Sequence, residues 1–348
     1  MARHNQPPGI TLLEALFVVL LILFLVAILL PALGGRGDTS MFKDGTQIRG
    51  IQQAMVTFAG NNQDTYPLPS LLDAQDTLPA IGGVQLQGAE KDLPRWIISL
   101  MIYNGLFGPE LSVSPKESNR SIRIDNNYEF SNPSAVEASK RSIAILDPAF
   151  AAFSNEPGGD TPIQRQGRFA PGAACSYAMV PLAGARRAVW SSTFDGTQAI
   201  IGNRGPWYEQ NAAGEWLLNR KDRRGAAKIR ASGSNTLLIH GARTSWEGNV
   251  ARNDGSINFE TRPDPENIPL FHWSSDGGSN PVPTRFDNIF ANEDEQSAAA
   301  RYSPSDDDIT EATNTRRNNY LRCFGDRAAR TFDADRKKLL AIGGFWYD

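Results

Sequence analysis

The longest apolar stretch of the chain lies near its amino end. Residues 16–30 read LFVVLLILFLVAILL, and extending this run back to residue 10 adds only two polar positions. At about 1.5 Å of rise per residue, a helix over 10–33 would reach across the ~30 Å hydrocarbon core of a bilayer. The pattern therefore predicts a transmembrane helix over 10–33, with a polar segment over 1–9 before it.

A cleaved secretory signal peptide is the competing interpretation of this stretch, with residues 31–35 as its cleavage region. Glu14 argues against it, because an ionised carboxylate near the middle of a bilayer costs about 2.5–3.5 kcal/mol and a signal peptide gains nothing from it. Gly9 gives a second argument, since the polar leader ends at this glycine, directly before Ile10. Both features favour a retained helix.

A helical periodicity follows the apolar stretch. Ile48, Ile51, Met55 and Phe58 are spaced three or four positions apart, which places them on one stripe of a helix. We therefore expect an amphipathic helix over 34–69 that continues into a folded domain.

Three features of this region together resemble the type IV pilin and type II secretion pseudopilin family. A short leader ends at Gly9, the sequence Ile-Thr-Leu-Leu-Glu runs from Ile10 to Glu14, and a long apolar run comes next. The ending NNQDTYP, with Tyr66-Pro67, is similar to the N-x-x-x-Y-P ending of the N-terminal helix in many pseudopilins. The resemblance covers residues 9 to about 70 and implies that the helix lies on a sheet.

The resemblance also implies how the N-terminus is processed and used. A prepilin peptidase would cleave after Gly9 and methylate the new amino group of Ile10. Glu14 would pair with the terminal amine of a neighbouring subunit, since a buried carboxylate is tolerable when paired. The protein would be a single-pass protein of the inner membrane, with its C-terminal domain periplasmic or extracytoplasmic.

Residues 70–262 contain short apolar segments separated by Pro, Asn and Gly, which predicts short strands and long loops rather than α/β units. One helix is expected over 95–107, where Trp96, Leu100 and Tyr103 share a side. The candidate strands are 173–180, 197–201, 235–240, 248–252 and 256–260.

The last two candidate strands form a predicted hairpin, because Asp254-Gly255 between them supplies the positive φ of a tight turn. The stretch from His240 to this turn is similar to the H-x9-DG tail signature of large pilin-like proteins, but thirteen residues separate His240 from Asp254 here. The predicted fold class is α+β and pilin-like. It has a long N-terminal helix, part transmembrane and part amphipathic, packed on an antiparallel β-sheet with large loop insertions.

The C-terminal region, 263–348, is polar and charge-segregated, with an acidic block over 293–311 and a basic block over 315–338. Such blocks either pair with each other as solvated faces or form a partner site. The chain has 35 basic and 38 acidic residues and a net charge of −3. This small net charge creates no positive electrostatic potential that would attract nucleic acid, so nucleic acid is not expected as a partner.

Catalytic motifs are absent from the sequence. It lacks the G-x-S-x-G pentapeptide, the P-loop and the G-x-G-x-x-G fingerprint. His240 and His272 could act as acid and base with Asp254 or Asp276, but isolated histidines near strand ends more often have a structural role. We expect no enzymatic activity and no cofactor.

One loop is a candidate for a metal. Residues 274–280, with Asp287 downstream, supply oxygen ligands of the kind that calcium prefers, and the major pseudopilins of the resembled family bind calcium in a C-terminal loop. The EF-hand pattern is not matched, and a surface turn is the alternative. No metal site is assigned.

The only two cysteines are Cys175 and Cys323, outside any CxxC pair, which excludes a zinc ribbon or a thioredoxin-type site. A disulfide between them would close a very long loop and contribute about 4–5 kcal/mol in the chain-entropy model. Two buried free thiols are the alternative.

The expected function is that of a structural subunit in a type II secretion or type IV pilus-like filament, processed by prepilin peptidase. The expected partners are that peptidase, other pilin or pseudopilin subunits through the N-terminal helix, and the inner membrane. The alternative is a membrane-anchored exported enzyme or carbohydrate-binding module that uses the helix as a tether. Exposed Trp and Tyr side chains on a concave face would favour that alternative.

Overall fold

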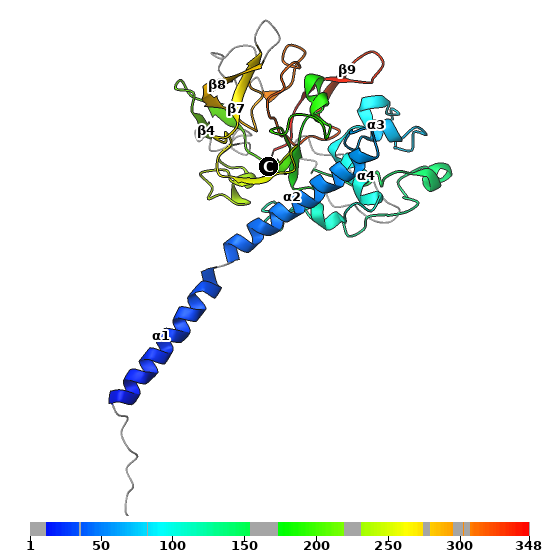
Figure 1. Cartoon of the computed structure of the whole chain (residues 1–348). Helices are drawn as coiled ribbons and strands as arrows, with labels where there is room; N and C mark the ends of the chain where they lie inside the picture. Colours follow the sequence, from blue (N-terminus) through cyan, green and yellow to red (C-terminus); the bar gives the residue numbers. More distant parts are fainter. Residues whose placement is uncertain are drawn as a thin grey trace, which may run out of the picture. The chain divides into compact units, whose positions relative to one another are not determined.

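A computed structural model gives the structure of the chain (Figure 1). It describes residues 12–34, 36–81, 83–153, 173–218, 231–273, 279–294, 302 and 307–347. The chain divides into two compact units, residues 1–43 and 44–348. Each unit is described by itself.

Two helices form the N-terminal region, α1 over Leu12–Gly34 and α2 over Arg36–Gly60. Residue 35, between the two, lies outside the described residues. α2 ends at Gly60, earlier than the expected end at 69. Gln63 and Asp64 then take φ values of 53° and 57°, a left-handed conformation that no helix continues through.

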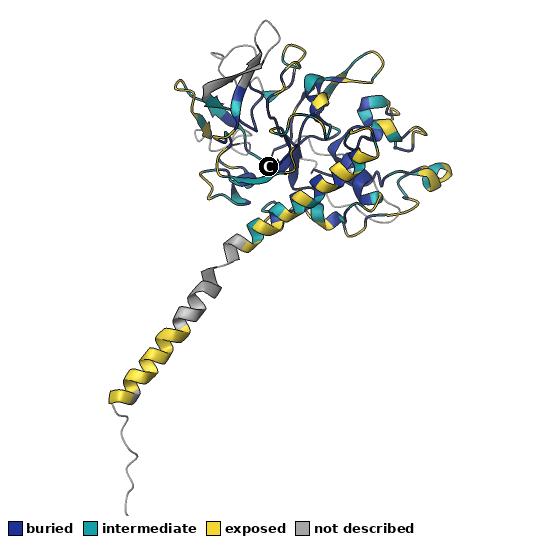
Figure 2. Cartoon of the chain, viewed as in Figure 1, coloured by how far each residue is buried: buried dark blue, intermediate teal, exposed yellow. Residues whose placement is uncertain are grey.

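Within the described part of the chain, no helix is both long enough and apolar enough to cross a membrane. The described side chains of α1, at residues 12, 13 and 15–25, are all exposed (Figure 2). The predicted transmembrane helix over 10–33 and the predicted single-pass inner-membrane location are therefore wrong.

One face of α2 is buried in the second unit. Ile48, Ile51 and Met55 are fully buried, whereas Phe58 at the end of the same stripe is only half-buried. On the other side of the helix, Val56 is 43% exposed. The predicted amphipathic character of this helix is confirmed for its described portion.

The helix α4, Pro94–Tyr103, lies between two hydrophobic clusters and is almost entirely buried. Ile98 and Met101 belong to the larger cluster, which also contains the buried face of α2, and Trp96 and Leu100 belong to the smaller one. The helix predicted over 95–107 is confirmed, with an earlier end. The shorter helical elements are α3 (Pro69–Leu72), η1 (Gly88–Lys91), η2 (Pro109–Ser112), η3 (Ala138–Ile143), η4 (Gly184–Val189) and η5 (Asn235–Leu238).

The described strands form four small antiparallel sheets. The largest has the order β1-β2-β5-β6, and three two-stranded ribbons pair β3 with β4, β7 with β8 and β9 with β10. The strands of the largest sheet are β1 (Tyr177–Met179), β2 (Ala199–Asn203), β5 (Gly248–Arg252) and β6 (Ile257–Glu260). The ribbons contain β3 (Tyr208–Gln210), β4 (Trp216–Leu218), β7 (Pro269–Trp273), β8 (Ser279–Phe286), β9 (Ala329–Phe332) and β10 (Leu339–Gly343).

The predicted hairpin of β5 and β6 is confirmed. Ala251 pairs with Ile257 next to the turn, and Gly255 takes a φ of 85°, which a glycine adopts without strain. The strand predicted over 235–240 is wrong, because η5 occupies this stretch. Ser234 precedes η5 and accepts a hydrogen bond from the Thr236 amide, a local side-chain contact that competes with strand pairing.

The predicted fold class, a pilin-like arrangement of one long N-terminal helix on an antiparallel sheet, is wrong. In the described part of the chain, the strands form four small sheets, and no single sheet carries one long N-terminal helix. Proline content is one physical reason, because proline cannot donate to a ladder and is confined to sheet edges. Pro269, Pro281 and Pro283 all lie within the ribbon of β7 and β8, where every strand is an edge.

Candidate functional site

The most unusual surface among the described residues is that of α1. Large apolar side chains along it are 49% to 87% exposed. Monomeric soluble proteins rarely expose so many neighbouring apolar side chains. The described side chains of this apolar surface are Leu12, Leu13, Leu16, Phe17, Val18, Val19, Leu20, Leu21, Ile22, Leu23, Phe24 and Leu25. They occupy every side of the helix rather than one stripe, which is typical of a helix surrounded by other apolar groups.

The predicted processing residues are not placed together by the structure. Gly9 and Ile10 lie outside the described residues. Glu14 lies in the first turns of α1, and only its backbone is described. The pairing of Glu14 with the amine of a neighbouring subunit stays a prediction.

A buried polar cluster joins α2 to the strands. Asp44 Oδ1 accepts a 3.0 Å hydrogen bond from the Tyr177 hydroxyl, and Asp44 Oδ2 accepts one of 3.0 Å from Asn249 Nδ2. His240 Nε2 lies 2.9 Å from the same Oδ2. A Cβ at Gly45 would come within 3.0 Å of Asn249 Oδ1, so the glycine permits the close approach of helix and strand.

This cluster stabilises the fold and does not present a base to solvent. Burial raises the pKa of Asp44, but hydrogen bonds from His240, Ser114 and Asn249 outweigh burial and leave this pKa below its usual range. The His240 side chain is only 4% exposed and packs edge-on against Phe259. The imidazole that the sequence offered as an acid or base therefore serves as a buried hydrogen-bond partner.

The other candidate acid–base and calcium residues are scattered. Asp254 lies exposed in the turn between β5 and β6, where it accepts a hydrogen bond from the Ser256 amide. The described part of His272 is its backbone in β7, and Asp276 lies outside the described residues. Within the described ranges, no group of three or more His, Cys, Asp or Glu side chains is arranged to hold a metal ion.

Asp287, the downstream member of the candidate calcium loop, is buried and already bonded by protein groups. Its Oδ2 accepts hydrogen bonds from the backbone amide and the side-chain amide of Asn319, at 2.8 and 2.6 Å. Residues 274–278 of the same loop lie outside the described residues. Asp287 is therefore oriented by Asn319.

Asp287 lies beside a second buried acid, Glu293. Burial raises the pKa of Glu293 and the nearby Asp287 carboxylate raises it further, whereas Arg285 at 2.7 Å favours its charged form. Burial also raises the pKa of Asp287. The sequence did not reveal these contacts: Glu293 begins an acidic block that could form a solvated face, and Asp287 was a candidate calcium ligand.

Cys175 and Cys323 are both buried free cysteines. The Cys175 thiol is within hydrogen-bonding distance of the Tyr177 carbonyl oxygen, at 3.5 Å. Of the two arrangements that the sequence allowed, a disulfide or two buried free thiols, the structure has the two free thiols. Burial in apolar surroundings makes both thiols structural rather than reactive groups.

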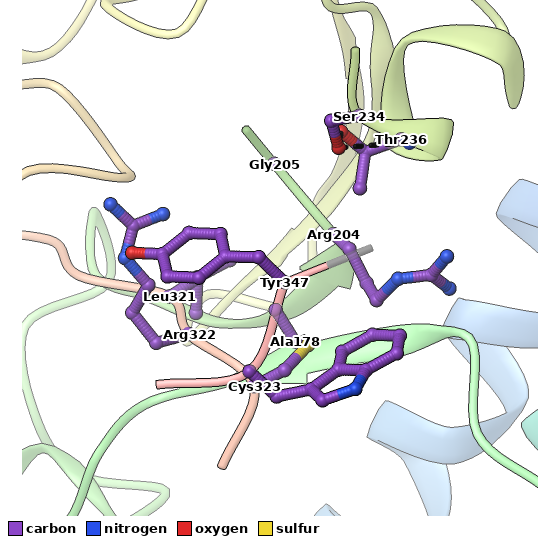
Figure 3. Close-up of a pocket in the computed structure, with 10 residues that line it drawn as sticks. Ala178, Arg204, Gly205, Ser234, Thr236, Leu321, Arg322, Cys323 and Tyr347 are labelled. Atoms are coloured by element: carbon purple, nitrogen blue, oxygen red, sulfur yellow. Dashed lines mark hydrogen bonds between the residues drawn. The ribbon is translucent and has the colours of Figure 1, made fainter. Parts of the chain in front are cut away.

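A small cavity near Cys323 collects several charged and aromatic side chains (Figure 3). Arg322 lies beside Tyr347 on one side of it, and Arg204 lies on the other. The cavity volume is about 10 Å³, which is room for one water molecule at most. Arg204 pairs with Glu117 at 2.6 Å, so this cluster is part of the core and not a ligand site.

Comparisons with protein families, with characterised proteins and with solved structures find no match to this chain.

Proposed function

We propose that the chain is a structural subunit of a filament of the type IV pilus or type II secretion pseudopilus kind, and that its copies associate through α1. The observation that carries the proposal is the exposed apolar surface of α1. Fully burying one Leu, Val, Ile or Phe side chain contributes about 1.5–3 kcal/mol, so covering this surface is strongly favourable. Parallel copies of the same helix would cover it on all sides by interlocking side chains.

The N-terminal sequence supports the same proposal. Cleavage after Gly9 by a prepilin peptidase would create a cation at Ile10, and Glu14 follows one helical turn later. In a bundle of α1 helices, the carboxylate of one copy would pair with the amine of the next, which offsets part of the cost of burying both charges. Mass spectrometry of the purified protein would show a chain that begins at Ile10 and bears a methyl group.

A cross-linking experiment tests the association of α1 directly. Leu20 is 57% exposed on α1 and Leu217 is 48% exposed on β4, so Leu20→Cys and Leu217→Cys form a matched pair. Both native cysteines are buried and leave the introduced thiol as the reactive one. We expect oxidation to link Leu20→Cys chains to one another in assembled material, and to leave Leu217→Cys chains unlinked.

Glu14→Leu, tested in the same assay, removes the carboxylate but keeps the apolar surface of α1. It therefore distinguishes the contribution of charge pairing from that of apolar contact. If Glu14 sets the register of neighbouring helices, Glu14→Leu in the Leu20→Cys background should lower the cross-linked fraction several-fold and abolish filaments recovered by shearing. Equal cross-linking of Leu20→Cys and Leu217→Cys, or a strictly monomeric chain, would contradict the proposal. Unchanged filaments from Glu14→Leu would remove the role of the carboxylate and leave the role of the apolar surface.

A further inference from the structure

A second surface of the molecule, separate from α1, has the features of a ligand site. A groove of about 750 Å³ is lined by the ribbon of β3 and β4 and by loop residues 244–246 and 261–263. This volume lies within the range of about 300–1,000 Å³ that is typical of small-molecule sites. The groove belongs entirely to the second unit.

The groove combines an apolar wall with hydrogen-bonding groups. Trp216 and Leu218 are half-buried in it, and Leu217 is 48% exposed. The amides of Gln210 and Asn211 line the same groove. Carbohydrate rings need this combination, because their C–H faces pack on aromatic or aliphatic surface while their hydroxyl groups bind amides and hydroxyls.

Several of these side chains are held in place by neighbouring groups. The Trp216 ring packs edge-on against Tyr302, with 5.3 Å between ring centroids. The Gln210 side-chain oxygen accepts a 3.1 Å hydrogen bond from the Tyr302 amide, and its nitrogen donates to the Gly214 carbonyl at 3.2 Å. Side chains that are already fixed lose little conformational freedom when a ligand binds.

The charges around the groove select against an anionic ligand. Arg262 is a basic group in its lining, and it is bonded to Asp264 at 2.9 Å and to Glu266 at 2.9 Å. Glu209 adds a further carboxylate to the lining. Among the described residues at the groove, the carboxylates outnumber the guanidinium, so phosphate-rich or sulfated ligands would meet net repulsion from this part of the chain.

We propose that this groove binds a neutral carbohydrate chain, with one sugar ring stacked on the indole of Trp216 and its hydroxyl groups accepting from the remaining N–H groups of the Gln210 and Asn211 side chains. The Asn211 oxygen already accepts from the backbone amides of Ala213 and Glu215. The site is independent of the filament role of α1. It would give an assembled filament a means to hold a polysaccharide on the surface of each subunit.

Isothermal titration of the full-length chain with cello-, chito- and malto-oligosaccharides tests the proposal. We expect at least one of the three series to bind in the micromolar to millimolar range, and Trp216→Ala to weaken that binding at least about tenfold. Leu217→Glu is the second variant, since this exposed position tolerates the change and the new charge would occupy the groove. Phe130→Ala is the control, an exposed aromatic at 57% outside the groove lining, and should bind as the wild type does.

Three results would overturn the proposal. One is failure of all three oligosaccharide series to bind the wild-type chain. Another is binding that survives in both Trp216→Ala and Leu217→Glu while their melting curves match that of the wild type. The third is a lysine-rich peptide that binds and displaces the sugar, which would make the groove a peptide site. Because groove variants leave α1 intact, Leu20→Cys cross-linking in the same chains reports on the filament role separately.

Discussion

His240 Nε2 lies 2.9 Å from Asp44 Oδ2, and 196 positions of sequence separate the two residues. This contact closes a very long loop and holds α2 against the strands of the second unit. Asp44 is completely buried and also receives hydrogen bonds from Tyr177, Asn249 and Ser114. A single carboxylate therefore satisfies donors from several separate segments of the chain.

Removing this carboxylate should destabilise the domain strongly. In Asp44→Ala, Tyr177 and Asn249 would lose the buried carboxylate that accepts from both, although Gln47 Oε1 at 3.1 Å remains an acceptor for the Tyr177 hydroxyl. We expect a loss of about 2–4 kcal/mol of unfolding free energy. Asp254→Ala is the control, because Asp254 lies exposed in a turn, and should cost under about 1 kcal/mol. Urea unfolding followed by circular dichroism measures both. Equal losses would show that the cluster does not stabilise the fold.

The same carboxylate should make the fold sensitive to acid. The pKa of Asp44 is below its usual range in the folded state, so this group contributes stability that is present above its unfolded pKa. That contribution is lost as the pH falls through the folded pKa. We expect the fall in unfolding free energy from about pH 6 to pH 3 to be shallower in Asp44→Asn than in the wild type. Parallel pH profiles would contradict this assignment.

The two cysteines provide a test of burial. Cys175 and Cys323 are free and buried, so neither should react with a thiol reagent in the native protein. Both should react once the chain is unfolded in denaturant without reductant. A chain that shows no reactive thiol after unfolding would contain the disulfide instead. Mass spectrometry after alkylation distinguishes the two states.

The ion pair of Arg322 and Asp307 joins the basic and acidic blocks of the C-terminal region at 2.6 Å, with side chains only 2% and 13% exposed. Arg322→Leu would leave the Asp307 carboxylate buried and unpaired by this guanidinium, at a cost of about 3–5 kcal/mol. Arg262→Leu breaks a pair whose arginine side chain is 44% exposed, and should cost at most about 1 kcal/mol. Comparable melting temperatures for the two variants would contradict this difference.

Local patterns of the sequence predicted local structure. The spacing of Ile48, Ile51 and Met55 identified the buried face of α2, and Asp254-Gly255 identified the hairpin of β5 and β6. These features depend on residues a few positions apart, where periodicity and turn chemistry decide the outcome. One ion pair, between Arg322 and Asp307, joins the two blocks of opposite charge, but it is buried rather than solvated.

Contacts between distant residues could not be read from the sequence. Nothing in the local pattern links Asp44 to His240, and a lone aspartate in an amphipathic segment reads as a solvated residue. The ribbon of β3 and β4 was also missed, although Gly214, with its φ of 84°, marks its turn. The global fold prediction was wrong because the sheet was inferred from family resemblance near the N-terminus, and strands so short and proline-rich do not determine how they assemble.

Glu293 gives the opposite pH dependence to Asp44. Burial raises its pKa to about 8, and the neighbouring Asp287 carboxylate contributes to the rise. An exposed glutamate titrates near about 4.3. Between these two values the folded chain holds a proton that the unfolded chain has released, so the unfolding free energy falls as the pH rises.

Glu293→Gln removes this titration and keeps a similar shape. We expect the variant to lose less stability than the wild type between about pH 6 and pH 9, by roughly 1–3 kcal/mol. Urea unfolding at the two pH values measures the difference. Glu266→Gln is the control, because its side chain is 73% exposed, and should follow the wild-type profile. Arg285 donates to Glu293 at 2.7 Å, and if this ion pair kept Glu293 charged throughout, the wild type and Glu293→Gln would show the same pH dependence.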